Sequence, residues 1–183
     1  MTQLALLAQE AGVHERTLRR AVNQGTLRAH RRSPRTLELP LSERLYVRRS
    51  WPLIAALRSA LRTDPNVRFA LLFGSTARGT DTPASDVDVL VELLDPGLER
   101  VIDLGERLTA ASSRPVEIVR LEAVRDDASF LGDVLAEGRV LVDRDEVWPS
   151  VRSRERMLRG RRRQEEVRRV EAALAGVDQL LAG

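Results

Sequence analysis

The sequence predicts an α+β protein in which a mostly helical N-terminal region precedes an α/β-like domain with a small mixed sheet and flanking helices. Short apolar runs of strand length alternate with helical patterns in the second part, and these runs are VRFALLF, VDVLVEL, RPVEIVRL and GRVLVD. The first part instead shows a helix, a turn, a second helix and a hairpin. We therefore expect four segments: residues 1–49 as one domain, 50–65 as a linker helix, 66–145 as the α/β-like domain and 146–183 as a helical tail.

Local signals support these elements. Thr2 can cap a helix over residues 2–9, and a second helix is expected over 14–24. Two strand-like runs follow it, at 26–30 and 36–39.

A long helix should cover residues 43–62, with Ser42 as a candidate N-cap. Pro52 predicts a break or kink in it, because proline removes a backbone donor. The domain that follows should have helices over 97–112 and 123–137.

Composition excludes several classes of site. The chain has no cysteine, which rules out disulfides and thiolate metal sites. All 30 basic residues are arginine, so a lysine-dependent phosphate loop is also ruled out. No apolar run approaches the roughly 20 residues of a membrane span, and the first ten residues lack a basic leader. These features predict a soluble cytoplasmic protein.

Charge is divided unevenly along the chain. Residues 14–49 hold 10 arginines against 3 glutamates, a net +7. Residues 66–145 hold 9 arginines against 16 acids, a net −7. This asymmetry predicts different partners for the two regions.

Two carboxylates stand at the head of the second strand-like run. Asp86 and Asp88 should point to the same side of a strand, with Val87 and Val89 in the core. Two ionised carboxylates so close repel each other unless one is protonated or a cation lies between them, and Mg²⁺ suits such a pair. Glu117 is the acid of the third run, and it is costly to bury unless it faces the same site.

A Gly-Ser turn precedes these carboxylates. Gly74 allows the backbone to approach a ligand closely, and free N–H groups at a helix start attract phosphate. The hydroxyl of Ser75 and the guanidinium of Arg78 can add hydrogen bonds to a triphosphate.

The segments FGSTARG and SDVDVLVE together resemble the nucleotidyltransferases of the DNA polymerase β superfamily, and most closely the minimal nucleotidyltransferase (MNT) type. The resemblance covers residues 66–145 and implies that Gly74 and Ser75 hold the triphosphate of ATP. It also implies that Asp86, Asp88 and, by position, Glu117 bind two Mg²⁺ ions. The family more often has aspartate at the third position, so Glu117 is a departure.

The implied reaction is transfer of a nucleotidyl group. An acceptor hydroxyl attacks the α-phosphorus of a nucleoside triphosphate and pyrophosphate leaves, with the metals assisting both oxygens. Glu117 is then the candidate general base.

The N-terminal segment AGVHERTLRRAVNQG resembles the second half of a helix-turn-helix unit, and the hairpin behind it resembles a wing. Exposed polar groups on such a helix can read the major groove of DNA, while the wing contacts phosphates. The candidate DNA-binding residues are Arg16, Thr17, Arg19, Arg20, Arg31, Arg32 and Arg35. A solvated basic helix, an RNA site or a surface for an acidic protein are the alternatives, and a palindromic DNA site would predict a homodimer.

MNT proteins are familiar as antitoxins that pair with HEPN toxins, and the resemblance implies transfer of AMP from ATP to a toxin tyrosine. A DNA-binding unit suits an antitoxin that also represses its own operon. The apolar seam in the tail is a candidate docking surface for the toxin or an intramolecular contact, and its residues are Val167, Val170, Leu174, Val177 and Leu181.

Other functions remain open at this point. The chain could be a nucleotidyltransferase toxin, an enzyme that modifies a small molecule or tRNA, or a non-catalytic regulator that senses nucleotide.

Overall fold

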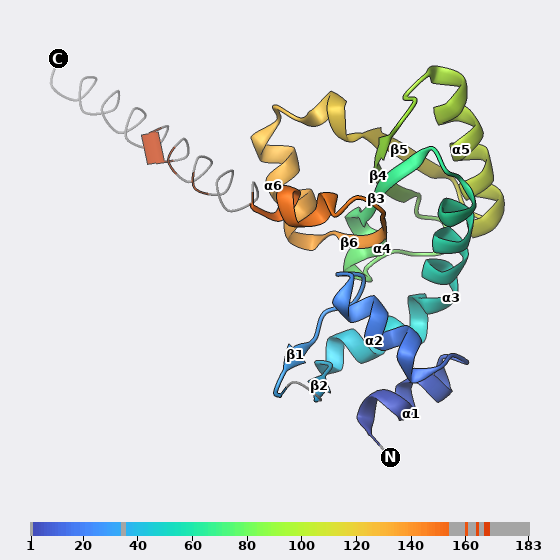
Figure 1. The fold of residues 1–183 in the computed structure, drawn as a ribbon, viewed down its shortest axis with the longest axis vertical. Helices are drawn as coiled ribbons and strands as arrows, with labels where there is room; N and C mark the ends of the chain where they lie inside the picture. The colour runs from blue at the N-terminus through green and yellow to red at the C-terminus, as the bar shows by residue number, and fades with distance from the viewer. Residues whose placement is uncertain (1, 34–35, 154–159, 161–163, 165–166, 169–183) are drawn as a thin grey trace, which may run out of the picture.

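The computed structural model describes residues 2–33, 36–153, 160, 164, 167 and 168 (Figure 1). The helices in chain order are α1 (Gln3–Glu10), α2 (Glu15–Asn23), α3 (Leu41–Thr63), α4 (Gly74–Arg78), α5 (Leu98–Ser112), the 3₁₀ helix η1 (Leu121–Val124) and α6 (Ala128–Glu137). The strands are β1 (His30–Arg31), β2 (Leu37–Glu38), β3 (Val67–Phe73), β4 (Val87–Leu93), β5 (Val116–Arg120) and β6 (Arg139–Asp143). Residues 147–153 are also helical.

The second half of the described chain forms a four-stranded sheet in the order β5-β4-β3-β6. β4 and β5 are parallel, whereas β3 is antiparallel to both of its neighbours. The sheet is therefore mixed and small, and helices flank it, which confirms the predicted α+β class.

Each face of this sheet packs against helices. Val87, Val89 and Val91 of β4 belong to the core that includes α3 and α5. Leu90 lies in a second core on the other face, with residues of α6 and the helical segment 147–153. Figure 1 shows α5 and α6 on opposite sides of the sheet. The strands are apolar on both faces because both faces are covered.

The N-terminal region contains α1, α2 and an antiparallel ribbon of β1 and β2. Thr2 caps α1, as predicted, by accepting a hydrogen bond from the N–H of Ala5. The apolar side of these elements joins the same core as the sheet, and Leu18 is fully buried in it. The turn after α2 is also tied to β6, because the Thr26 hydroxyl donates to the Val140 carbonyl at 2.6 Å.

The predicted break at Pro52 and the predicted N-cap at Ser42 are wrong. α3 begins at Leu41 with Pro40 as its N-cap, and it runs unbroken past Pro52. Proline inside a helix costs ~3 kcal/mol or more, but the neighbouring side chains of Trp51 and Ile54 are buried and hold the helix in place. Ser42 therefore lies inside the helix and does not cap it.

The strand expected at 26–30 is also displaced, to His30–Arg31. The N–H groups of Thr26 and Leu27 instead both donate to the carbonyl of Ala21 at the end of α2. This part of the chain closes the helix and cannot pair as a strand.

A buried ion pair connects the N-terminal region to the sheet. Arg139 of β6 contacts Glu43 of α3 at 2.5 Å, and both side chains are almost fully buried. Arg139 also donates to the carbonyl of Ala77 at 2.7 Å, and its guanidinium lies 3.5 Å from the ring centroid of Tyr46. Burial raises the pKa of Tyr46 to about 12. The side chain of Arg139 thus connects β6 to α3 and α4.

None of the helices in the described ranges has an apolar stretch long enough to cross a membrane.

Candidate active site

Gly74 lies at the junction of β3 and α4, directly against a carboxylate. Its φ of 68° is in the left-handed region, which favours glycine. A Cβ at this position would overlap the carboxylate of Asp88. The turn can therefore approach Asp88 only because residue 74 has no side chain.

Sheet register brings two of the predicted acids together. Asp88 of β4 is paired with Glu117 of the parallel neighbour β5, so both side chains leave the same face. Asp86 lies just before β4, whose first residue is Val87. Asp88 is half-buried, while Asp86 and Glu117 are exposed. We call these three residues the acidic cluster.

The acidic cluster is electrostatically coupled. Partial burial, followed by the charges of Glu117 and Asp86, raises the pKa of Asp88 above its usual range, and Arg78 opposes this rise. Burial and, after it, the repulsion between nearby carboxylates both favour a proton or a cation at Asp88.

The chemistry of these side chains fits a divalent cation, since carboxylates are the ligands that Mg²⁺ prefers. Among the residues that the structure describes, however, no three acidic, histidine or cysteine side chains are already arranged around a metal-sized space. Asp86 and Glu117 are exposed and can rotate towards Asp88. The metal set of Asp86, Asp88 and Glu117 therefore stays a prediction.

The other predicted nucleotide ligands lie on α4. Ser75 is half-buried in the first turn of this helix, where backbone N–H groups have no partner inside the helix. Arg78 is at the end of α4 and pairs with Glu137 of α6 at 2.7 Å. Arg78 is thus close enough to influence Asp88, but it already has a carboxylate partner.

Arg114 is a site residue that sequence reasoning missed. It precedes β5 and is largely buried, and its Nε donates to the carbonyl of Ser85 at 2.9 Å. It also pairs with Asp81 at 2.8 Å and donates to the Thr76 hydroxyl at 3.3 Å. Arg114 therefore clamps the loop that leads to Asp86 against α4. Its position three residues before Glu117, at the head of the same strand, was the available signal.

A second arginine holds the same loop from α3. Arg49 pairs with the carboxylate of Asp81 and donates to the carbonyl of Gly79 at 2.6 Å. Asp81 therefore has two arginine partners, which explains why its side chain is buried although the loop lies at the surface.

The predicted DNA-binding residues are spread over α2 and the ribbon. Arg16, Thr17 and Arg20 of α2 are exposed. Three others have acceptors nearby: Arg19 pairs with Glu15 at 2.6 Å, Arg32 with Glu38 at 2.5 Å, and Arg31 donates to Asn23 at 3.2 Å.

The remaining predicted contacts fall largely outside the described ranges. Arg35 does, and so does the apolar seam of the tail except for Val167, which is exposed.

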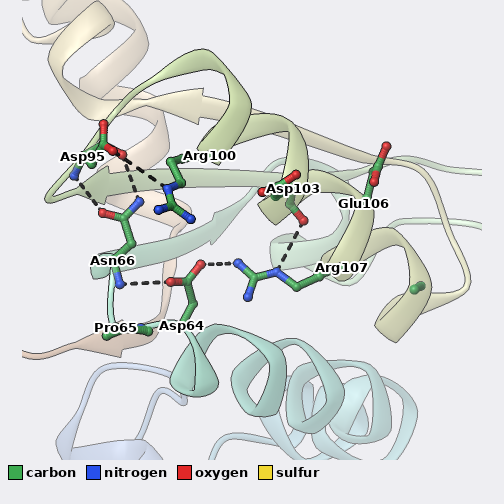
Figure 2. A pocket seen from close by; sticks show the side chains of 9 residues that line it. Asp64, Pro65, Asn66, Asp95, Arg100, Asp103, Glu106 and Arg107 are labelled. Atoms are coloured by element: carbon green, nitrogen blue, oxygen red, sulfur yellow. Dashed lines mark hydrogen bonds and ion pairs between the residues drawn. The ribbon is translucent and has the colours of Figure 1, made fainter.

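A cleft of about 700 Å³ lies at the opposite end of β3 from Gly74 (Figure 2). Its two arginines have acidic partners, since Arg107 pairs with Asp64 and Arg100 with Asp95. The Asn66 side chain also exchanges hydrogen bonds with the backbone of Asp95. This cleft contains none of the predicted site residues, and the motif chemistry places the candidate active site at the other end of the strand.

Comparison with solved structures supports the fold. A chain of a toxin–antitoxin complex crystallised with AMP-PNP aligns with a TM-score of 0.52 and 20% identity over 66% of this chain and 98% of its own length. A chain of a mutant toxin–antitoxin complex of MntA aligns with a TM-score of 0.53 and 18% identity, over 66% and 98%. No curated protein sequence matches the chain.

Residues 56–147, half of the chain, match the profile of the family described as "Polymerase beta, Nucleotidyltransferase". This range contains the Gly74 turn, the acidic cluster and Arg114. The chain therefore belongs to the polymerase beta nucleotidyltransferase family.

Proposed function

We propose that this protein is a Mg²⁺-dependent adenylyltransferase of the antitoxin kind, which transfers AMP from ATP to a HEPN-type toxin. The observation that carries the proposal is the contact of the Gly74 turn with Asp88, which is in register with Glu117 on the neighbouring strand. A phosphate bound at the turn would therefore lie beside Asp88, one of the carboxylates that would hold Mg²⁺. Likeness in fold to chains of toxin–antitoxin complexes, one of them crystallised with AMP-PNP, supports the choice of ATP and of a toxin partner.

The chain's own residues account for binding and proton transfer. The N–H groups of Ser75 and Thr76 and the Ser75 hydroxyl hold the β- and γ-phosphates. A hydroxyl oxygen of the acceptor attacks the α-phosphorus, the bond to the β-phosphate oxygen breaks, and pyrophosphate leaves. Glu117 takes the hydroxyl proton, because its exposed carboxylate faces the same side of the sheet as Asp88. Mg²⁺, when bound by the acidic cluster, neutralises the charge that develops on the phosphate oxygens.

A transfer assay tests this proposal. Purified protein is incubated with α-labelled ATP, Mg²⁺ and the HEPN-type product of a neighbouring gene, and label is followed on the partner. We expect labelling that falls by at least about a thousandfold in the Asp86→Asn, Asp88→Asn double variant. Glu92→Gln is the matched control, since Glu92 is half-buried on the same strand and face as Asp88 but lies four residues further along.

The molecule that receives the label distinguishes the antitoxin assignment from the other candidate functions. Label on a small molecule or tRNA, with none on the toxin, would replace the antitoxin assignment with a modifying enzyme. Label on an essential host protein would indicate a toxin. Binding of ATP without transfer to any acceptor would leave a nucleotide-sensing regulator.

We also propose that the N-terminal region binds operator DNA, so that the protein represses its own operon. The exposed arginines of α2 and the net +7 of residues 14–49 support this second role. A gel-shift assay on the protein's own promoter tests it with Arg16→Met and Thr17→Val. Unchanged affinity and unchanged sequence preference in both variants would remove α2 from the DNA contact.

A further inference from the structure

A second cavity, of about 400 Å³, lies between α2 and α3, outside the candidate active site. We call it the arginine cavity, and its lining residues are Thr17, Arg20, Trp51, Ala55, Arg58, Ser59, Arg62 and Thr63. Among the residues that the structure describes, three guanidinium groups and three hydroxyls line it, and no carboxylate does.

The arginines of this cavity have no acidic partner in the part of the chain that the structure describes. Arg58 is 7% exposed and donates to the Thr26 hydroxyl and, at 2.6 Å, to the side-chain oxygen of Gln24, which are both neutral. The cleft of Figure 2 differs, because there Arg107 pairs with Asp64. Both arginines of that cleft have a carboxylate partner within it, whereas those of the arginine cavity have none among the described residues.

Holding these cations together is unfavourable for the protein alone. Arg58 and Arg62 are four residues apart on α3, the spacing at which like charges repel across one helical turn. Burial, and then the charge of Arg62, lowers the pKa of Arg58 to about 10. In the same wall, the indole N–H of Trp51 is buried with no hydrogen-bond partner among the described residues. An anion in the cavity would offset the charge repulsion.

We propose that the arginine cavity binds a phosphate group, carried either by a free phosphorylated molecule or by the backbone of a nucleic acid. Arginine forks donate paired hydrogen bonds to phosphate oxygens, and the hydroxyls of Thr17 and Ser59 supply further donors. The volume leaves room for the group to which the phosphate is bound. The inference does not depend on nucleotidyl transfer; only the nucleic-acid source rests on the proposed DNA contact.

The test uses the two tryptophans of the chain. Trp148→Phe leaves Trp51, in the cavity wall, as the only tryptophan. Asp86→Asn and Asp88→Asn, with a chelator present, remove the metal-dependent phosphate site. The fluorescence of this protein is then titrated with inorganic phosphate, against chloride at the same ionic strength. We expect a saturable change, with affinity about tenfold weaker after Arg20→Met or Arg62→Met.

Arg48→Met is the matched control, because Arg48 is an exposed arginine of α3 that does not line the cavity. Arg58 is left unchanged, since it also anchors the turn after α2. Circular dichroism and the melting temperature check that each variant is folded.

A second arm identifies the source of the phosphate. Binding to a duplex that carries the protein's own promoter is measured over a range of salt concentrations. If DNA is the source, Arg62→Met lowers the slope of log affinity against log salt by about one unit, and inorganic phosphate alone gives no saturation. Saturation by phosphate with an unchanged salt slope identifies a free ligand. If neither response depends on Arg20 and Arg62, the proposal is overturned, even where Arg16→Met still weakens DNA binding.

Discussion

The acidic cluster and the arginine cavity each gather charges of one sign, and in each of them burial and neighbouring like charges shift the pKa of one residue towards its neutral form. Partial burial, and then the charges of Glu117 and Asp86, raise the pKa of Asp88, so this carboxyl can accept a proton in place of a cation. The same two effects lower the pKa of Arg58 only to about 10, so the cavity stays cationic at neutral pH. A cation bound at the acidic cluster would therefore compete with a proton for Asp88, whereas an anion would offset the repulsion in the arginine cavity.

The buried pair of Glu43 and Arg139 gives the reference for this comparison. Here opposite charges meet and satisfy one another inside the core. Removing one charge from this pair should destabilise the fold, while removing one charge from either like-charged group should relax it. At the acidic cluster and at the arginine cavity, removal of one charge should therefore raise the stability of the fold and weaken the binding of the ligand.

The largest effect on stability is expected from Glu43→Gln. The change leaves Arg139 as a buried cation without a carboxylate, which costs about 3–5 kcal/mol of unfolding free energy. Chemical denaturation followed by circular dichroism measures it. Glu10→Gln is the control, because Glu10 forms an exposed pair with Arg48 and should shift the midpoint very little. An equally small shift for Glu43→Gln would mean that Arg139 is held by its carbonyl acceptors alone.

The next effect is on catalysis, from Arg114→Met. We expect nucleotidyl transfer to slow by about 10–100-fold in kcat, because the loop before Asp86 loses its clamp and a small displacement of a catalytic group is costly. The fold should survive, since Asp81 keeps Arg49 as a partner. Steady-state kinetics with varied ATP separate kcat from KM.

Two variants sharpen the Arg114 result. Arg114→Lys should restore only part of the rate, because an ammonium group cannot reach Ser85 and Asp81 together in the geometry of a guanidinium. Arg120→Met, at the far end of the same strand, should leave kcat unchanged. A parallel loss of rate in Arg120→Met would indicate general damage to β5 and no positioning role for Arg114.

The clamp also illustrates what the sequence could and could not predict. The pairing of Asp88 with Glu117 was accessible, because both acids stand in short apolar runs that read as neighbouring strands. The contact of Arg114 with Asp81 was not, because no periodicity relates a loop residue to an arginine that far along the chain. The unbroken α3 was missed for a similar reason, since tertiary burial beside Pro52 outweighs a local rule.

A third prediction concerns pH and metal. Because the folded state raises the pKa of Asp88, it takes up a proton at a higher pH than the unfolded chain does. In metal-free buffer this group therefore adds stability as pH falls through the raised pKa, and the gain is complete below the ordinary pKa of aspartate. Asp88→Asn should accordingly be more stable than the native protein at pH 8, with the difference shrinking as the pH approaches 4.

With Mg²⁺ present, the gain in stability of the native protein should be largest at high pH, where Asp88 is ionised. Thermal melts with and without Mg²⁺ should show stabilisation at pH 8 that weakens on acidification, because protons compete for Asp88. The Asp88→Asn variant should lose most of this response, whereas Glu92→Gln should keep it. If Mg²⁺ stabilises Asp88→Asn as much as the native protein, the ion does not bind at the acidic cluster.

The smallest effect is expected at the arginine cavity, from Arg62→Met. Without ligand, removal of one of two like charges four residues apart on a helix should stabilise the fold by about 0.2–0.5 kcal/mol. In phosphate buffer the order should reverse, because the native cavity gains an anion that the variant binds poorly. Thermal melts in phosphate and in chloride at equal ionic strength measure the stability difference between Arg62→Met and the native protein in each buffer. A variant less stable than the native protein in both buffers would show that the aliphatic part of Arg62 matters more than its charge, and the parallel with Asp88 would fail.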